Sequence, residues 1–264
     1  MNTKYKNWLK ELVEPDSVDL SSFSIQDSLH PKFWDKDQKL DPKIRKRLMK
    51  IAMKFMNELD ISEDDILDIT MTGSLANYNW SKYSDVDLHI IVNYPDIDDN
   101  ADLAQSFITA KRITWNNTHN IKIYGFEVEV YVQDDSEEHM STGVYSVQFD
   151  EWKTKPTRQE VTFCQACVQN KSAGLMDEID EIEKQFQNNN YAAVFKNTQR
   201  MKDKIKKLRQ SGLESGGAYS VENLAFKVLR RNGYLGKLSD LKNASYDELM
   251  SMENGNSGRI RIKI

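Results

Sequence analysis

Little in this sequence of 264 residues suggests a membrane, a secretion signal or a cysteine-based site. No apolar run reaches the length that spans a bilayer and no signal-peptide core is present, so we expect a soluble, cytoplasmic protein with no membrane partner. The two cysteines, Cys164 and Cys167, have no histidine nearby, which makes a zinc site unfavourable and favours packing in a helix. The net charge of −5 argues against sequence-blind coating of nucleic acid and leaves room for a local basic groove.

The strongest chemical signal is a pair of aspartates that opens an apolar run. We expect a β-strand over Val86–Val92. Asp85 directly precedes this strand, and Asp87 is its second residue. Side chains two apart on a strand point to the same face, roughly 7 Å apart along it. Carboxylates in that arrangement bind a pair of divalent cations for in-line phosphoryl or nucleotidyl displacement. The pattern therefore predicts two Mg²⁺ ions, for which Mn²⁺ can substitute.

A glycine-serine pair stands just before these aspartates. Gly73 and Ser74 follow a predicted strand, Ile66–Met71, and the glycine permits a tight turn and close approach of the backbone. Ser74 is expected to cap a short helix, Leu75–Asn79, whose free N–H groups would receive phosphate oxygens. We therefore predict that this turn holds the triphosphate of an NTP beside the metal ions.

Taken together, Gly73-Ser74 and Ser84-Asp85-Val86-Asp87-Leu88 resemble the signature of the DNA polymerase beta-like nucleotidyltransferase superfamily. The resemblance implies an α+β fold, in which a nucleotidyltransferase core, a mixed sheet with flanking helices, is followed by a helical C-terminal domain. More loosely, the chain is similar to nucleotidyltransferases of large tailed phages. That wider likeness rests on Leu29-His30-Pro31-Lys32-Phe33-Trp34, Gly143-Val144-Tyr145-Ser146 and Glu222-Asn223-Leu224.

The superfamily pattern implies a third carboxylate on a neighbouring strand. Ile121–Gln133 alternates apolar and polar residues, as a half-buried strand does, with Glu127 and Glu129 on its polar face. The setting Val128-Glu129-Val130 fits the pattern better, so Glu129 is expected to join Asp85 and Asp87 as a metal ligand and catalytic residue. Glu127 is the alternative.

The rest of the chain suggests four segments. We expect an N-terminal extension over residues 1–40, a catalytic domain over 41–152, a helical domain over 153–250 and a flexible tail over 251–264. The catalytic domain should begin with a helix that Asp41-Pro42 starts and that ends near Leu59. Trp152–Pro156 is interpreted as a linker.

Helical periodicity dominates the second domain. Helices are expected over Ser172–Asn188, Tyr191–Gln210 and Ser220–Arg231, with a break at Gly212–Gly217. On the second of them, cations recur at spacings of four and three: Lys196, Arg200, Lys204 and Lys207. The resemblance implies that such a cation reaches the phosphates of the bound nucleotide, and a solvated surface face is the alternative.

Two further side chains are candidates for the site. Tyr145 either stacks on a nucleotide base or packs in the core, and His89 shares the face of Asp85 and Asp87. The resemblance as a whole implies an enzyme that moves an NMP from an NTP to an acceptor hydroxyl and releases pyrophosphate. The acceptor stays open between an RNA 3′ end, a second nucleotide, a small molecule and a protein hydroxyl. A cyclic or linear oligonucleotide synthase and a catalytically silent binding module are the alternative functions.

Overall fold

The computed structural model describes residues 13–137 and 141–252, and the chain divides into two compact units. One unit comprises residues 21–161 and the other comprises residues 1–20 together with 162–264. The predicted tail lies outside the described residues from position 253 onward. The predicted α+β class, a mixed sheet with flanking helices followed by a helical C-terminal part, is confirmed. The four predicted segment limits stay predictions.

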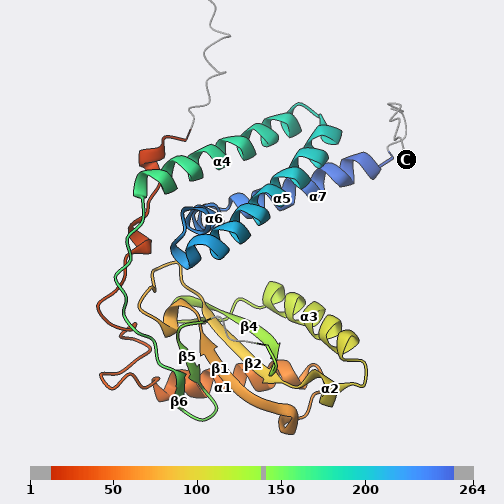
Figure 1. Ribbon diagram of the computed structural model, residues 1–264. Helices are drawn as coiled ribbons and strands as arrows, with labels where there is room; N and C mark the ends of the chain where they lie inside the picture. The colour runs from red at the N-terminus through yellow and green to blue at the C-terminus, as the bar shows by residue number, and fades with distance from the viewer. Residues whose placement is uncertain (1–12, 138–140, 253–264) are drawn as a thin grey trace, which may run out of the picture. The chain divides into compact units, whose positions relative to one another are not determined.

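A six-stranded mixed sheet forms the first unit (Figure 1). Its strands lie in the order β3-β4-β2-β1-β5-β6, and β2 and β4 run parallel while the other neighbouring pairs are antiparallel. The bounds are β1 Ile66–Thr72, β2 Val86–Val92, β3 Lys122–Ile123, β4 Phe126–Asp134, β5 Val144–Ser146 and β6 Glu151–Thr154. The two predicted strands that flank the Gly-Ser turn are thus β1 and β2, which pair with each other at the centre of the sheet.

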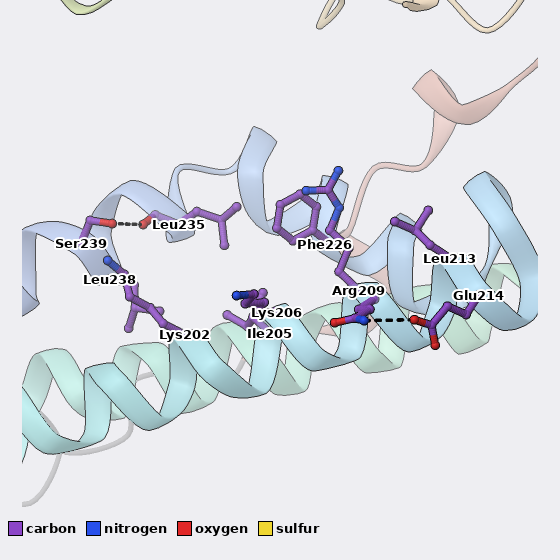
Figure 2. A pocket seen from close by; sticks show the side chains of 11 residues that line it. Lys202, Ile205, Lys206, Arg209, Leu213, Glu214, Phe226, Leu235, Leu238 and Ser239 are labelled. Atoms are coloured by element: carbon purple, nitrogen blue, oxygen red, sulfur yellow. Dashed lines mark hydrogen bonds between the residues drawn. The ribbon is translucent and has the colours of Figure 1, made fainter. Parts of the chain in front are cut away.

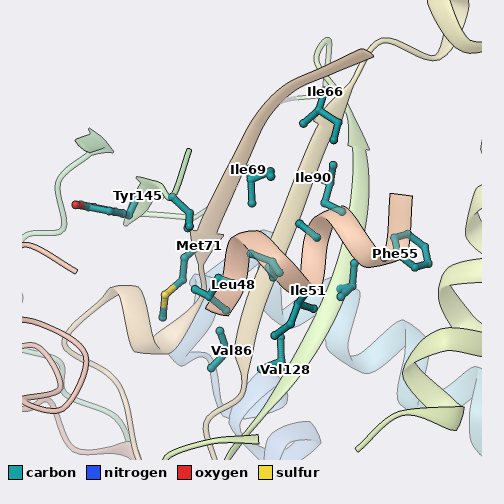
Figure 3. Close-up of a cluster of buried hydrophobic side chains, with 14 of the residues drawn as sticks. Leu48, Ile51, Phe55, Ile66, Ile69, Met71, Val86, Ile90, Val128 and Tyr145 are labelled. Atoms are coloured by element: carbon teal, nitrogen blue, oxygen red, sulfur yellow. The ribbon is translucent and has the colours of Figure 1, made fainter. Parts of the chain in front are cut away.

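Helix α1, Pro42–Asn57, covers the apolar face of this sheet. Asp41 is its N-cap, as predicted, and the Asp41 carboxylate accepts hydrogen bonds from the backbone N–H groups of Lys43 and Ile44. One apolar stripe of the helix packs against alternate residues of three strands in a single core (Figure 3). Its members are Leu48, Ile51 and Phe55 of α1 with Ile69, Met71, Val86, Ile90 and Val128 of the sheet. Because these residues occupy the apolar face, the intervening polar residues line the other face.

Helix α3, Ala101–Thr118, packs beside β4, after the short helix α2, Tyr94–Ile97. The Asn116 amide donates to the carbonyl of Val130 at 2.9 Å and accepts from the Val130 N–H at 3.0 Å. This side chain therefore pairs with the backbone N–H and C=O of Val130 on the side of β4 that faces away from β2. Trp115 of the same helix reaches the core, where its ring packs against Phe55.

The prediction of one continuous strand over Ile121–Gln133 is wrong. Tyr124 and Gly125 both have positive φ, 51° and 93°, and turn the chain between β3 and β4. Two central residues of positive φ are typical of the tight turns that fit the twist of a hairpin. The alternation changes phase at this turn, from apolar residues at odd positions (Ile121, Ile123) to apolar residues at even positions (Phe126, Val128), and the prediction of one strand overlooked that change.

The segment before α1 and strands β5 and β6 complete the sheet unit. Trp34 is buried, stacks on Trp152 at 4.6 Å between ring centroids, and donates its indole N–H to the carbonyl of Leu75. The prediction of a linker at Trp152–Pro156 needs correction, because Glu151–Thr154 is the edge strand β6 and Trp152 packs against the core.

The second unit is helical. It contains α4 Gln165–Gln187, α5 Tyr191–Gly216, α6 Val221–Arg231 and α7 Tyr234–Met250. Both predicted ends of α6 are confirmed. Ser220 caps its start, and Gly233, with φ 76°, follows its last turn. The break predicted over Gly212–Gly217 occurs at the end of that range, because α5 continues through Gly212 to Gly216 and its C-cap is Gly217, with φ 68°. A Cβ at Gly212 would lie 2.5 Å from the Cβ of Glu222, so this glycine permits close packing instead of ending the helix.

The two cysteines form a disulfide, Cys164–Cys167, at the start of α4. Cys164 is the N-cap and its sulfur accepts a hydrogen bond from the Cys167 N–H. Both residues are exposed, so the expectation that they pack within a helix is wrong. In the described part of the chain, no helix is long and apolar enough to cross a membrane.

Candidate functional site

Three carboxylates meet on the polar face of the sheet. Asp85 directly precedes β2, Asp87 is its second residue, and Glu129 lies on β4. Asp87 and Glu129 are register partners of the parallel pair β2–β4, so their side chains lie side by side. One carboxylate oxygen from each of the three residues lies within 4.8 Å of the others, and all three residues are half-buried. The structure thus brings together the three acids that the sequence singled out.

This cluster fits a divalent cation chemically. Carboxylate oxygens are the ligands that Mg²⁺ and Mn²⁺ prefer, and three of them at one point of a half-buried surface repel one another unless a cation compensates their charge. Among residues 13–137 and 141–252, no other group of three His, Cys, Asp or Glu side chains lies close enough to share an ion.

Gly73 leaves room for the Asp87 carboxylate. Its backbone has φ 75° and ψ −160°, a combination open to glycine and strained for other residues. A Cβ at this position would lie 1.8 Å from Oδ2 of Asp87. The close backbone approach that the sequence suggested is therefore made to the side chain of Asp87.

Ser74 does not cap a helix as the sequence predicted. The expected helix over Leu75–Asn79 is a single 3-10 turn, Ser74–Ala76, and Ser74 is its first residue instead of its cap. The Ser74 hydroxyl donates to Oγ of Ser84 at 2.7 Å, and Ser84 Oγ also accepts from the Ser81 N–H at 3.0 Å. Ser74 thus ties the Gly-Ser turn to the loop before Asp85. So short a turn supplies little helix dipole for a phosphate.

Tyr131 lies two residues after Glu129, on the same face of β4. Its hydroxyl donates a hydrogen bond to Oε2 of Glu129. Burial, followed by the hydrogen bond to Glu129 and the charge of that carboxylate, raises the pKa of Tyr131, so it stays a donor at neutral pH. Sequence reasoning did not select Tyr131, although its spacing of two from Glu129 predicts a shared face.

His89 extends the same row of polar groups. It stacks on Tyr131 with 4.9 Å between ring centroids, and its Nδ1 lies 3.0 Å from Oε1 of the buried Gln133. His89 therefore supports Tyr131. Glu127 lies apart from the acidic cluster: it is exposed, and its carboxylate pairs with Lys122 of β3 at 3.3 Å.

A polar pocket of about 400 Å³ adjoins the acidic cluster between α3 and β4. Glu129 belongs to both, and Tyr131, which donates a hydrogen bond to Glu129, also lines the pocket. The guanidinium of Arg112, on α3, lies 5.0 Å from the ring centroid of Tyr131. Sequence reasoning missed Arg112 and this pocket, because only the packing of α3 on β4 brings the residue near the site.

Tyr145 belongs to the core. Its ring is fully buried, packs edge-on against Trp34 and Trp152, and its hydroxyl donates to Asp150 at 2.7 Å. Of the two interpretations of Tyr145, core packing is the one that the structure supports.

The cations predicted on α5 lie in the helical unit. All four, Lys196, Arg200, Lys204 and Lys207, are exposed. Lys204 pairs with both oxygens of Glu178 on α4, at 2.6 and 2.7 Å, and Arg200 and Lys204 line one pocket between α4 and α5. A second pocket of this unit, about 480 Å³, lies between α5, α6 and α7 (Figure 2). Most of its surface is apolar, and three further cations of α5 also line it, Lys202, Lys206 and Arg209.

No family model matches this sequence, and no curated protein matches it. Among solved structures, the chain is similar to a STING-associated CdnE c-di-GMP synthase from Capnocytophaga granulosa, at 14% sequence identity over 80% of this chain and 84% of that chain. The TM-score is 0.21, which does not establish a common fold. The functional argument therefore rests on the residues of this chain.

Proposed function

We propose that this protein is a metal-dependent nucleotidyltransferase that moves an NMP from an NTP to an acceptor hydroxyl. The observation that carries the proposal is the cluster of Asp85, Asp87 and Glu129, whose carboxylate oxygens approach within 4.8 Å of one another. Gly73 supports it, because its missing side chain leaves the space that the Asp87 carboxylate occupies.

Each residue has a distinct role in the proposed reaction. Asp85, Asp87 and Glu129 would hold divalent ions, which when bound neutralise the triphosphate and acidify the acceptor hydroxyl. Glu129 accepts the hydroxyl proton as a new bond forms between the acceptor oxygen and the α-phosphorus, and the bond from that phosphorus to pyrophosphate breaks. Tyr131 fixes the orientation of Glu129 through its hydrogen bond.

The phosphate contacts form the next part of the proposal. Gly73 and Ser74 lie beside Asp87 and Ser84, and we assign them to the triphosphate. Lys196, Arg200 and Lys204 are proposed as cations of the helical unit that contact the β- and γ-phosphates. If they do, neutralising one of them should raise the KM for NTP more than it lowers kcat, because a phosphate contact of this kind contributes mainly to uniform binding.

The direct test is incubation with each labelled NTP and Mg²⁺ or Mn²⁺, with and without total RNA, followed by separation of the products. Asp85→Ala and Asp87→Ala are expected to abolish turnover while far-UV circular dichroism stays unchanged, because both side chains lie on the polar face, away from the core. Wild-type rates in either variant would refute the proposal.

Two glutamates of β4 provide a matched comparison. Glu129→Gln should lower kcat by about 100-fold or more, the scale expected for loss of a catalytic base or metal ligand. Glu127→Gln, which removes an exposed carboxylate two residues away and outside the acidic cluster, should have a much smaller effect. The opposite ranking would move the third carboxylate to Glu127.

A further inference from the structure

The pocket between α3 and β4 opens beside the residue that we assign as the proton acceptor. Glu129 contributes to both the pocket and the acidic cluster, so a molecule in the pocket lies next to that carboxylate. The volume of about 400 Å³ is that of a typical small-molecule site. This inference rests on the proposed function, because it concerns what approaches Glu129 from that side.

Arg112 brings a positive charge into this pocket, next to the negative charge of the acidic cluster. Glu127 is paired with Lys122, and Glu129 faces the Tyr131 hydroxyl and the acidic cluster. Within residues 13–137 and 141–252, by contrast, no carboxylate lies within ion-pair distance of Arg112, whose guanidinium lies over the ring of Tyr131. Such a guanidinium keeps its planar set of donors for an anion, and phosphate is the oxyanion that this geometry fits best with two bonds.

The pocket between α3 and β4 is also lined by neutral side-chain amides. Asn117 and Asn120 line the pocket and are exposed, and their amides form no hydrogen bond with other described residues. Each amide offers a donor beside an acceptor, the pattern that pairs with the edge of a nucleobase. Asn116, in contrast, is occupied by the backbone of Val130 and takes no part in binding.

We propose that this pocket binds a nucleotide unit of the acceptor, with its phosphate on Arg112, its base near Asn117 and Asn120, and its reacting hydroxyl toward Glu129. The nucleotide unit is either a free nucleotide or the terminal nucleotide of an RNA. Acceptors without a phosphate bind more weakly because Arg112 is then left without an anion.

The test measures binding without metal, so that it is independent of turnover. The probes are AMP, adenosine and a short RNA with a free 3′ hydroxyl, titrated into the full-length protein in the presence of EDTA. Arg112→Gln is compared with Lys111→Gln, which neutralises the next residue of α3, a lysine outside the pocket that lies over Phe107.

We expect AMP or the RNA to bind, with AMP favoured over adenosine. Arg112→Gln should weaken binding of the phosphate-bearing probe by about tenfold to a hundredfold, the effect of losing a hydrogen bond to a charged group, and should leave adenosine unchanged. Lys111→Gln should match the wild type for all probes. Whether AMP or the RNA shows the dependence on Arg112 identifies the source of the nucleotide.

Failure of this inference is distinguishable from failure of the proposed function. If labelled NTP is turned over but neither AMP nor RNA binding depends on Arg112, the pocket assignment is refuted and the nucleotidyltransferase proposal stands. If Arg112-dependent binding occurs and no NTP is consumed under any condition, the pocket is a nucleotide site and the proposed reaction is wrong. If Arg112→Gln and Lys111→Gln weakened binding of the phosphate-bearing probe equally, the effect would come from the net charge of α3 and the inference would be overturned.

Discussion

Replacing Gly73 by alanine tests the geometry of the acidic cluster most directly. The added Cβ would lie 1.8 Å from Oδ2 of Asp87, whereas ordinary van der Waals contact begins at 3.4 Å. The Asp87 carboxylate must therefore move by about 1.6 Å, or the turn must open. In addition, the backbone conformation at φ 75° and ψ −160° is strained for any residue with a side chain, by roughly 1–3 kcal/mol.

The expected result has two parts. The free energy of unfolding of Gly73→Ala should fall by roughly 1–3 kcal/mol. Its affinity for Mn²⁺ and its NTP turnover should fall together, and turnover should fall by about 100-fold or more, because a displacement of about 1 Å at a reacting site has an effect of that size. Denaturant unfolding measures the first part, and titration of Mn²⁺ with an NTP turnover assay measures the second.

Gly125 supplies the control. It also has positive φ, 93°, yet a Cβ there would meet nothing within 4 Å. Gly125→Ala should therefore be destabilised by backbone strain and keep its affinity for Mn²⁺. A folded Gly73→Ala variant with wild-type affinity and turnover would refute the argument that this glycine is needed to accommodate Asp87.

Three further predictions concern stability. Trp34→Phe removes the donor to the buried carbonyl of Leu75 and should lower the free energy of unfolding by about 1–3 kcal/mol in a urea titration. Ser146→Ala removes the 2.7 Å hydrogen bond to the buried carboxylate of Asp68 and should have an effect of about the same size by the same assay, whereas an unchanged midpoint would show that Asp68 finds another donor. Burial among aromatic rings lowers the pKa of His30 below 6.5, so below that pH the unfolded chain binds a proton at His30 more readily than the folded chain does. The contribution of His30 to the free energy of unfolding should therefore be constant above about pH 6.5 and fall as the pH drops below it. His30→Phe should flatten that part of the pH profile, and an identical slope in both proteins would contradict the assignment.

Two sources led to the predicted parts of the site. Asp85 and Asp87 follow from local spacing, because they are two apart at the start of a strand, whereas the period of two on β4 leaves Glu127 and Glu129 on one face and only the superfamily resemblance favoured Glu129. Arg112 and Tyr131 were not predicted. The approach of α3 to β4 depends on how Trp115 packs into the core, and no local pattern encodes that contact.

The errors in the fold have physical causes as well. Apolar and polar residues alternate on both sides of the turn at Tyr124-Gly125 but in opposite phase, and the run before the turn is too short to be recognised as a separate strand. Gly212 looked like a helix end because glycine usually weakens a helix interior, whereas here close packing against Glu222 requires it. The four residues of β6 are too few and too exposed to show a strand pattern.

The amide of Asn116 also has a consequence for self-association. Strand β3 pairs only with Phe126 and Glu127, so the outer side of β4 beyond them would offer free backbone groups to a strand from another molecule. Asn116 occupies those groups at Val130. At the opposite edge of the sheet, the short β6 carries the charged residues Glu151 and Lys153, which disfavour pairing with a strand of another molecule. Both borders of the sheet are thus protected against edge-to-edge aggregation, and Asn116→Leu would remove that protection on the β4 side.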